Sequence, residues 1–360
     1  MKIILAFEMK STETGISLSD TATKYTIKCG NGKYHFSFLN DTKQYAPVKC
    51  LDLAKYQQAI TLKDQNNQLY LGQFYQIKHA MNSFDTLCND TMVIPKLFQK
   101  GKIVSSAVMQ INSIGYLELK VRDITNYYAI TIHPHQSIVY LDDLVYLKKQ
   151  KDHGPIEMMR LYWDPLLELL REIDNLHSQG LMKLQLSPEE MCYDQKNNKF
   201  WIMDLSNSIY YAQEKIIFAE TIRYIGAGSY RYISPEELLI TSDQYEHKIN
   251  IDYYRMDLQS YLIVLNLIIF EKTLFSYYFN QEMPIQYPQF CIQIWFRAYD
   301  YGQNCFNQEF KEKWSRTYND FKDLPEMKPL IDSLTKVWDI PNFKVNTSKL
   351  YQKLKLIKIP

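Results

Sequence analysis

Between residues 24 and 50 the chain alternates apolar and polar residues in short runs. Runs at 25–27, 34–38 and 45–50 carry this two-residue period, and turn residues separate them at 30–32 and 40–41. Because successive side chains of a strand point to opposite faces, such runs predict half-buried strands. Strand, turn, strand, turn, strand is the pattern of a three-stranded meander.

Helical spacing dominates later in the chain. One apolar stripe recurs at i, i+3, i+4, i+7 and i+10 and predicts an amphipathic helix that ends near His177. Its residues are Leu166, Leu169, Leu170, Ile173 and Leu176. The apolar run 261–270 has about half the length that spans a bilayer, so it predicts a buried core helix. Leu71, Phe74 and Ile77 are spaced i, i+3 and i+6, which predicts a helix over 69–78.

The segment 176–208 follows the long helix and carries a polar loop at 183–190. A hairpin comes next, and its second strand at 200–203 leads to Asp204. This segment resembles the catalytic segment of the protein kinases, in which H-R-D-x-x-x-x-N precedes D-F-G. The resemblance implies an α+β, bilobal protein kinase-like fold. Its small lobe has an antiparallel sheet plus one helix, and its larger lobe is mostly α-helical.

Further stretches resemble kinase motifs in the same order. Gly30 and Gly32 stand where the glycine-rich loop is expected, and Lys49 matches the lysine of the third strand. Gln73 stands in the predicted helix where kinases carry a glutamate that pairs with this lysine. The order I-P, V-M and G-x-L-E between residues 94 and 118 resembles the casein kinase 1 group.

The resemblance continues into the second half. Pro235 and Glu236 match the end of the kinase activation segment, and Asp257 matches the acid that opens helix F. The resemblance implies that Asp257 holds the backbone of the catalytic loop. Lys344 stands where an arginine pairs with Glu236, and lysine offers a point charge instead of a bidentate fork.

These matches divide the chain into an N-terminal extension at 1–22, a small lobe at 23–112 and a large lobe at 113–360. The extension contains one candidate strand. Residues 125–155 are expected to be an insertion in the large lobe, as extra strands, a short helix or a loop.

The reacting groups depart from the kinase pattern. Gln185 replaces the catalytic aspartate, Ser187 replaces the loop lysine, and Glu190 replaces the asparagine that binds a metal ion. An amide cannot accept a proton from a hydroxyl at neutral pH, and losing one catalytic group costs on the order of 10²–10⁴ in rate. We therefore expect a catalytically inactive kinase-like protein, a pseudokinase, that acts as a scaffold, structural or regulatory subunit of an intracellular protein assembly.

An alternative is a divergent casein kinase 1-like Ser/Thr protein kinase, with Glu189 or Glu190 as the base. It requires ATP and Mg²⁺, whereas the pseudokinase requires no cofactor. A weak nucleotide site would use the glycines at 30 and 32, Lys49 and Asp204. Carboxylate oxygens suit Mg²⁺, so Asp204 and Glu190 are its expected ligands if nucleotide binds.

The composition and net charge favour proteins, and not nucleic acid or a membrane, as the partners of this chain. The chain has 46% hydrophobic and 22% charged residues and a net charge of +1, so no strong field attracts nucleic acid or a membrane. Its six cysteines lie far apart, which is typical of reduced thiols in the cell interior. We expect a soluble cytoplasmic protein, with the cytoskeleton as one candidate location, that binds neither nucleic acid nor membrane.

Overall fold

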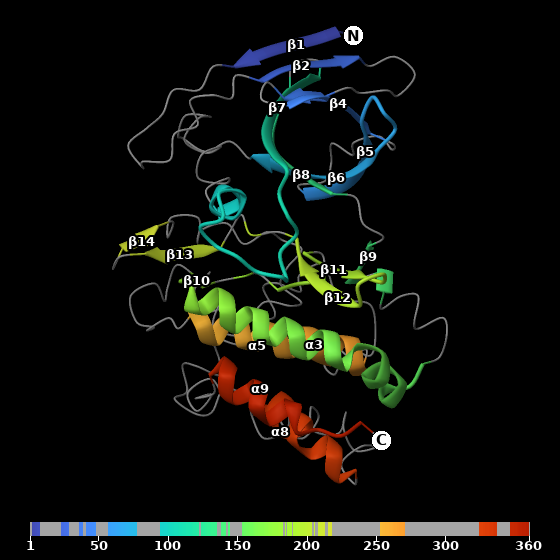
Figure 1. Ribbon diagram of the computed structural model, residues 1–360, viewed down its shortest axis with the longest axis vertical. Helices are drawn as coiled ribbons and strands as arrows, with labels where there is room; N and C mark the ends of the chain where they lie inside the picture. The colour runs from blue at the N-terminus through green and yellow to red at the C-terminus, as the bar shows by residue number, and fades with distance from the viewer. Residues whose placement is uncertain are drawn as a thin grey trace. The chain divides into compact units, whose positions relative to one another are not determined.

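A computed structural model gives the fold of the chain (Figure 1). It describes residues 2–7, 23–28, 36–38, 41–47, 57–77, 94–121, 124–134, 138–141, 143–144, 153–182, 184, 186–188, 190–203, 205, 208–212, 215–217, 253–270, 324–336 and 346–359. The chain divides into two compact units. Unit 1 comprises Met1–Val104 and Met109–Ser137, and unit 2 comprises Ser105–Val108 and Ile138–Pro360. The chain is thus mixed α+β with small antiparallel sheets, as the sequence predicted.

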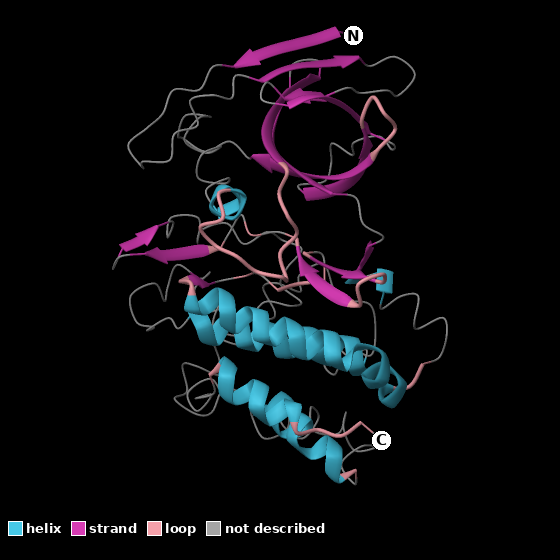
Figure 2. Cartoon of the chain, in the orientation of Figure 1, coloured by secondary structure: helices cyan, strands magenta, loops and turns pink. Residues whose placement is uncertain are grey.

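Unit 1 is built on a six-stranded antiparallel sheet of order β3-β4-β5-β6-β8-β7, which is strongly curved (Figure 2). Its strands are β3 (Phe36–Phe38), β4 (Asp41–Pro47), β5 (Gln57–Lys63), β6 (Leu69–Ile77), β7 (Ser113–Val121) and β8 (Ile124–Pro134). A separate antiparallel pair joins β1 (Lys2–Phe7) to β2 (Thr23–Lys28). The expected meander is therefore only partly right, because β2 pairs with β1 instead of β3.

The predicted helix over 69–78 is wrong, because these residues form β6. This strand lies between β5 and β8, and its residues 70–74 are all buried, so both of its faces are covered. A strand covered on both faces reads as a continuous apolar run without alternation. Gly72 allows the close packing, since a Cβ there would lie 2.6 Å from Leu62 Cδ1.

In the casein kinase 1 group the I-P match lies on a strand, but here it lies on a helix. Residues 94–99 form a short helix with Pro95 in its first turn. Proline is tolerated there because its missing N–H would have no intrahelical partner.

Unit 2 is mostly helical among its described residues. Its helices are α3 (Pro155–Ser178), α5 (Tyr253–Phe270), α8 (Lys328–Lys336) and α9 (Thr347–Lys355), with a 3₁₀ turn, η4 (Pro325–Met327), before α8. α3 packs against both α5 and α9, and Tyr261 donates a hydrogen bond to the Leu166 carbonyl over 2.9 Å. The stripe predicted for α3 is confirmed, since all five residues are at most 2% exposed. The buried helix predicted from the run 261–270 is confirmed by α5.

Two small antiparallel sheets complete unit 2. One has the order β12-β11-β9 and the other the order β10-β13-β14. Their strands are β9 (Ile138–Tyr140), β11 (Met191–Asp194), β12 (Lys199–Ile202), β10 (Leu181–Met182), β13 (Ile209–Ala212) and β14 (Lys215–Ile217). The hairpin predicted before Asp204 is confirmed by β11 and β12.

The two compact units do not divide at 112/113, where the sequence analysis places the boundary between the lobes. β7 and β8 pair with each other, and β8 pairs with β6, so both strands belong to the sheet of unit 1. Within the expected insertion at 125–155 the chain forms extra strands, one of the alternatives named for it: β8 belongs to the sheet of unit 1, and β9 belongs to unit 2. Within the described residues, the structure contains no helix with the length and apolarity needed to cross a membrane.

Candidate functional site

The loop that begins the candidate site is anchored at the end of α3. Gly180 follows the helix with φ +84°, a conformation that glycine adopts without strain. Its carbonyl accepts a hydrogen bond from Tyr211 N over 2.8 Å, and β10 pairs with β13 beside it. A Cβ at Gly180 would lie 2.2 Å from the Tyr211 carbonyl oxygen, so this turn requires glycine.

Asp257 on α5 holds the loop from beneath. Its Oδ1 accepts a hydrogen bond from Leu184 N over 2.7 Å, and its Oδ2 lies 2.9 Å from His177 Nε2. A carboxylate only accepts, so Nε2 carries the hydrogen of this bond. His177 Nδ1 then lies 3.3 Å from the Thr347 hydroxyl of α9, which can donate to it. Asp257 thus makes the backbone contact that the kinase resemblance implied for it.

The hairpin β11–β12 is closed by a buried carboxylate. Asp194 accepts hydrogen bonds from the backbone N–H groups of Lys196 and Asn197 and from the side chains of Asn197 and Trp201. Burial alone would raise the pKa of Asp194, but these hydrogen bonds outweigh it and hold the pKa below its usual value. These hydrogen bonds therefore stabilise the turn that joins β11 to β12.

Ser187 and Glu190, two of the positions that the kinase resemblance singled out, are described and both are buried. Glu190 N donates to the Ser187 carbonyl over 3.0 Å, and the Glu190 carbonyl accepts from Met203 N over 2.7 Å. The end of the loop therefore lies beside the residue that precedes Asp204. Within the described part of the chain, the Ser187 hydroxyl has no hydrogen-bond partner.

Several predicted site residues lie outside the described residues: Gly30, Gly32, Lys49, Gln185, Asp204, Pro235, Glu236 and Lys344. Among the residues that are described, no three His, Cys, Asp or Glu side chains gather as metal ligands.

Gln73 does not have the role predicted for it. It lies on β6, where it faces Ala59 and Thr131 across the sheet, so it cannot replace a helix glutamate. It is 2% exposed, and its Oε1 has no hydrogen-bond partner within the described residues.

His177 and Thr347 were not singled out from the sequence. The signal for His177 was present, because it ends the predicted helix with a polar ring on an otherwise apolar stripe. No local signal exists for Thr347, which lies 170 residues from its partner.

No protein-family model matches this sequence, and no curated protein matches it either.

Proposed function

We propose that this chain is a pseudokinase, a kinase-like protein without phosphotransfer activity, that serves as a scaffold, structural or regulatory subunit of an intracellular protein assembly. One observation carries the proposal. Asp257 holds the backbone of the loop at Leu184, and the next residue, where a kinase requires a carboxylate, is Gln185.

The order of elements in unit 1 supports a kinase-like small lobe. When β4, β5 and β6 are counted as its first three strands, the helix at 94–99 comes where helix C is expected. Residues 94–99 contain no Asp or Glu, so this helix lacks the acid that pairs with the strand lysine in active kinases.

The same count changes the expected lysine. Lys49 follows β4, whereas Lys78 directly follows β6 in the sequence Tyr75-Gln76-Ile77-Lys78. Lys78 is therefore the better match to the lysine of V-A-I-K. Any residual nucleotide site should depend on Lys78 more than on Lys49.

Nucleotide binding and phosphate transfer test the loss of activity. The full chain is titrated with ATP and Mg²⁺ while its thermal midpoint is followed, and Lys78→Ala and Lys49→Ala are compared. In parallel, transfer of radiolabelled phosphate to a generic substrate is measured. We expect no transfer above the level without protein. Transfer that Lys78→Ala abolishes would overturn the proposal.

One observation favours the alternative of a divergent kinase: Glu190 lies beside Met203, the residue that precedes Asp204. If Glu190 acts as the base, Glu190→Gln should reduce any transfer at least tenfold, whereas Asp164→Asn at an exposed site on α3 should not.

The scaffold role requires a partner. The full chain is purified with an affinity tag from its native cells, and its mass in solution is measured by light scattering. We expect defined companion proteins at fixed ratios. A monomer that co-purifies with nothing would contradict the scaffold role without restoring an enzymatic one.

A further inference from the structure

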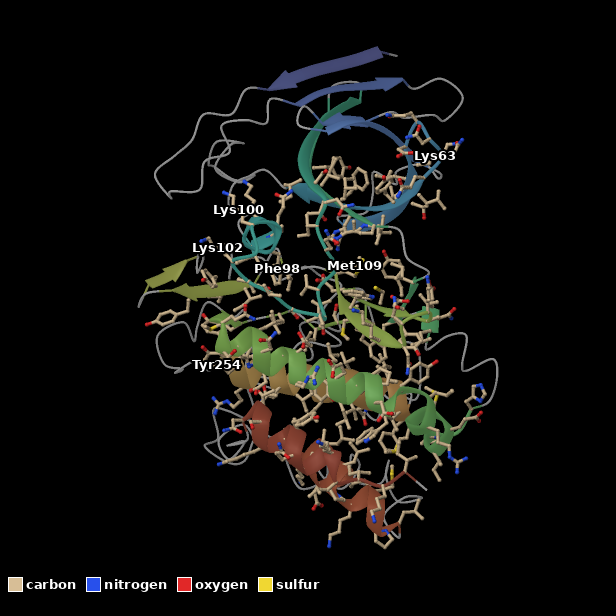
Figure 3. All side chains as sticks on the ribbon, in the orientation of Figure 1. Lys63, Phe98, Lys100, Lys102, Met109 and Tyr254 are labelled. Atoms are coloured by element: carbon tan, nitrogen blue, oxygen red, sulfur yellow. The ribbon has the colours of Figure 1, made fainter. Side chains whose placement is uncertain are left out.

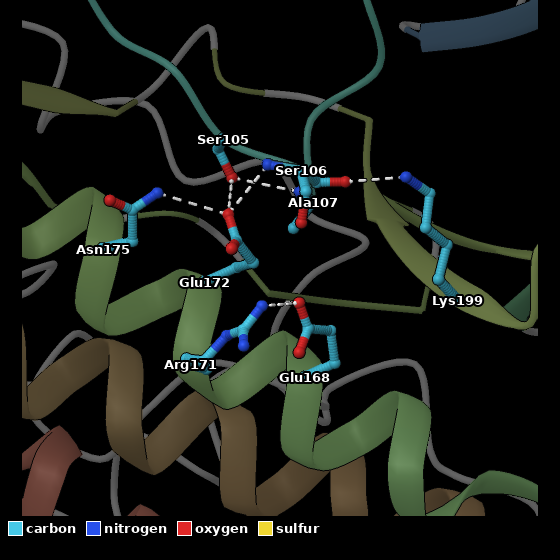
Figure 4. A network of polar contacts seen from close by, with 8 residues as sticks. All are labelled: Ser105, Ser106, Ala107, Glu168, Arg171, Glu172, Asn175 and Lys199. Carbon is cyan, nitrogen blue, oxygen red and sulfur yellow. Dashed lines mark hydrogen bonds and ion pairs between the residues drawn. The ribbon is translucent and has the colours of Figure 1, made fainter.

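Four residues, Ser105–Val108, lie between two stretches of unit 1 in the sequence but belong to unit 2. We call them the crossing segment. Its first half is bound by Glu172 of α3, whose Oε2 accepts hydrogen bonds from the Ser105 hydroxyl and from Ser106 N, each over 2.8 Å (Figure 4). The Asn175 side chain donates to the same oxygen over 3.3 Å. A single carboxylate therefore collects three donors.

The second half of the crossing segment is bound by β12. Ile202 N donates to the Ala107 carbonyl over 2.8 Å, and Val108 forms a parallel bridge with Ile202. Lys199 Nζ donates to the Ser106 carbonyl over 3.0 Å while it lies 3.5 Å from the centre of the Trp201 ring. The crossing segment is thus held between α3 and β12 by bonds to its backbone and one hydroxyl.

Glu172 is charged at neutral pH. Burial alone would raise its pKa, but the hydrogen bonds from Ser105, Ser106 and Asn175 outweigh burial and lower the pKa from its usual value. The side chain is only 7% exposed, so the attachment depends on donors that face a poorly hydrated negative charge.

A phosphate on Ser105 would reverse this interaction. The ester oxygen of a phosphoserine has no hydrogen to donate, and its phosphate carries a charge of about −1.5 to −2 at pH 7. The ester oxygen would replace the hydroxyl oxygen that now lies 2.8 Å from Glu172 Oε2, so the phosphate would lie close to the carboxylate. Two like charges that lie close together in a partly buried site repel strongly.

Ser105 can be reached from solvent. It is partly exposed, its neighbour Ser106 is exposed, and Val104 just before it is 65% exposed. In the sequence, Lys102 and Lys100 precede Ser105 by three and five residues, and both are exposed. Figure 3 labels these two lysines. Basic residues at these distances form a charge pattern that a kinase with an acidic substrate groove can select.

We propose that Ser105 is a phosphorylation site for a separate, basic-directed Ser/Thr protein kinase, and that its phosphate releases the crossing segment from Glu172. In the reaction, the Ser105 oxygen forms a bond to the γ-phosphorus of ATP. The bond from that phosphorus to the bridging oxygen breaks, ADP leaves, and the hydroxyl proton passes to the base of the kinase. This inference does not depend on whether the chain itself is a pseudokinase.

Release is tested on the full chain with phosphoserine incorporated at position 105. Hydrogen–deuterium exchange is followed at the Ser106 and Ile202 amides, which donate to Glu172 and to the Ala107 carbonyl. We expect their protection to fall at least tenfold. Val104→Glu is the matched control, because it adds a negative charge one residue earlier on an exposed side chain. Unchanged protection with phosphoserine, or an equal loss in the control, overturns the release.

Acceptance of phosphate is tested separately. The full chain is incubated with Mg²⁺, ATP and the catalytic subunit of the cyclic AMP-dependent protein kinase, and the modified residue is mapped by mass spectrometry. We expect phosphate on Ser105, its loss in Ser105→Ala, and at least tenfold slower labelling when Lys100 and Lys102 are both changed to Ala. Phosphate on other residues alone would overturn the assignment.

Discussion

Asp257 fixes the candidate site by serving two donors at once. It binds the Leu184 amide of the loop and the His177 ring at the end of α3, and its side chain is 3% exposed. Because the Asp257 carboxylate lies on α5, it ties the loop to the helix layer of unit 2. Loss of the Asp257 side chain therefore removes both hydrogen bonds at once.

Replacing Asp257 by Ala should therefore be strongly destabilising. The substitution leaves a buried amide and a buried imidazole without an acceptor, which predicts a loss of about 3 kcal/mol in the free energy of unfolding. Urea denaturation measures it, with Asp164→Ala on the exposed side of α3 as the control. A loss below about 1 kcal/mol would show that the contact has little effect on stability.

His133 makes unit 1 sensitive to acid. Its Nδ1 lies 3.1 Å from the Gln110 carbonyl, to which it donates, and its Nε2 lies 2.8 Å from the Thr131 hydroxyl, from which it accepts. Burial lowers the pKa of His133 from 6.5 to about 4, so the folded protein keeps the ring neutral.

Between these two values the unfolded chain binds more protons than the folded one, so stability falls as the pH is lowered from 6.5 toward 4. His133 should contribute about 3 kcal/mol to this loss. Chemical denaturation from pH 7 to pH 4.5 measures it. His133→Gln should be less stable at pH 7 but show a shallower dependence, and an identical slope would contradict the prediction.

At the scale of elements, the spacing of apolar residues predicted the two buried helices α3 and α5. The stripe from Leu166 to Leu176 gave α3, and the apolar run 261–270 gave α5, because a helix that packs on a core repeats its apolar residues every three or four positions. β6 was missed because a strand buried on both faces loses its alternation, and Leu71, Phe74 and Ile77 then coincide with helical spacing.

The sites depend on contacts that no local pattern contains. Glu172 binds Ser105 across 67 positions, and His177 binds Asp257 across 80. The kinase resemblance predicted the backbone contact of Asp257, because a family motif implies contacts between residues that are far apart in the sequence. It predicted no contact for Glu172. A polar residue on or beside the apolar face of a predicted helix, such as Glu172 or His177, is a signal that the sequence does contain. The partner of such a residue can be identified only from the fold.

The end of α3 provides a test at this scale. Gly180→Ala should cost about 3 kcal/mol, because it combines a left-handed backbone with a Cβ that meets the Tyr211 carbonyl at 2.2 Å. Gly101→Ala is the matched control. Gly101 also has a positive φ, +65°, but no atom lies within 4 Å of the added Cβ, so only about 1 kcal/mol is expected. Equal losses would show that the contact with Tyr211 does not matter.

The whole molecule consists of two units that share one interleaved chain. Unit 2 receives the chain at the crossing segment and again at Ile138. The hydrogen bonds of Glu172 hold the first of these entries in place. Loosening this attachment should destabilise unit 2, to which both Glu172 and the crossing segment belong.

Glu172→Ala tests this attachment. It removes the acceptor of three donors, so the free energy of unfolding should fall by about 2–3 kcal/mol, which urea denaturation measures. Glu168→Ala, one turn earlier on α3, removes a part-exposed ion pair with Arg171 and should change stability by less than about 1 kcal/mol. Equal losses in both variants would show that the contacts of Glu172 do not stabilise unit 2.

The interleaved chain also has a consequence during synthesis on the ribosome. Ser105 is made 67 residues before Glu172, and β12 follows later still. At roughly 5–20 residues per second, the Ser105 hydroxyl waits about 3–13 seconds for the carboxylate that will bind it. A nascent chain therefore passes through an interval in which the Ser105 hydroxyl is not yet bound by Glu172 and can meet a modifying enzyme.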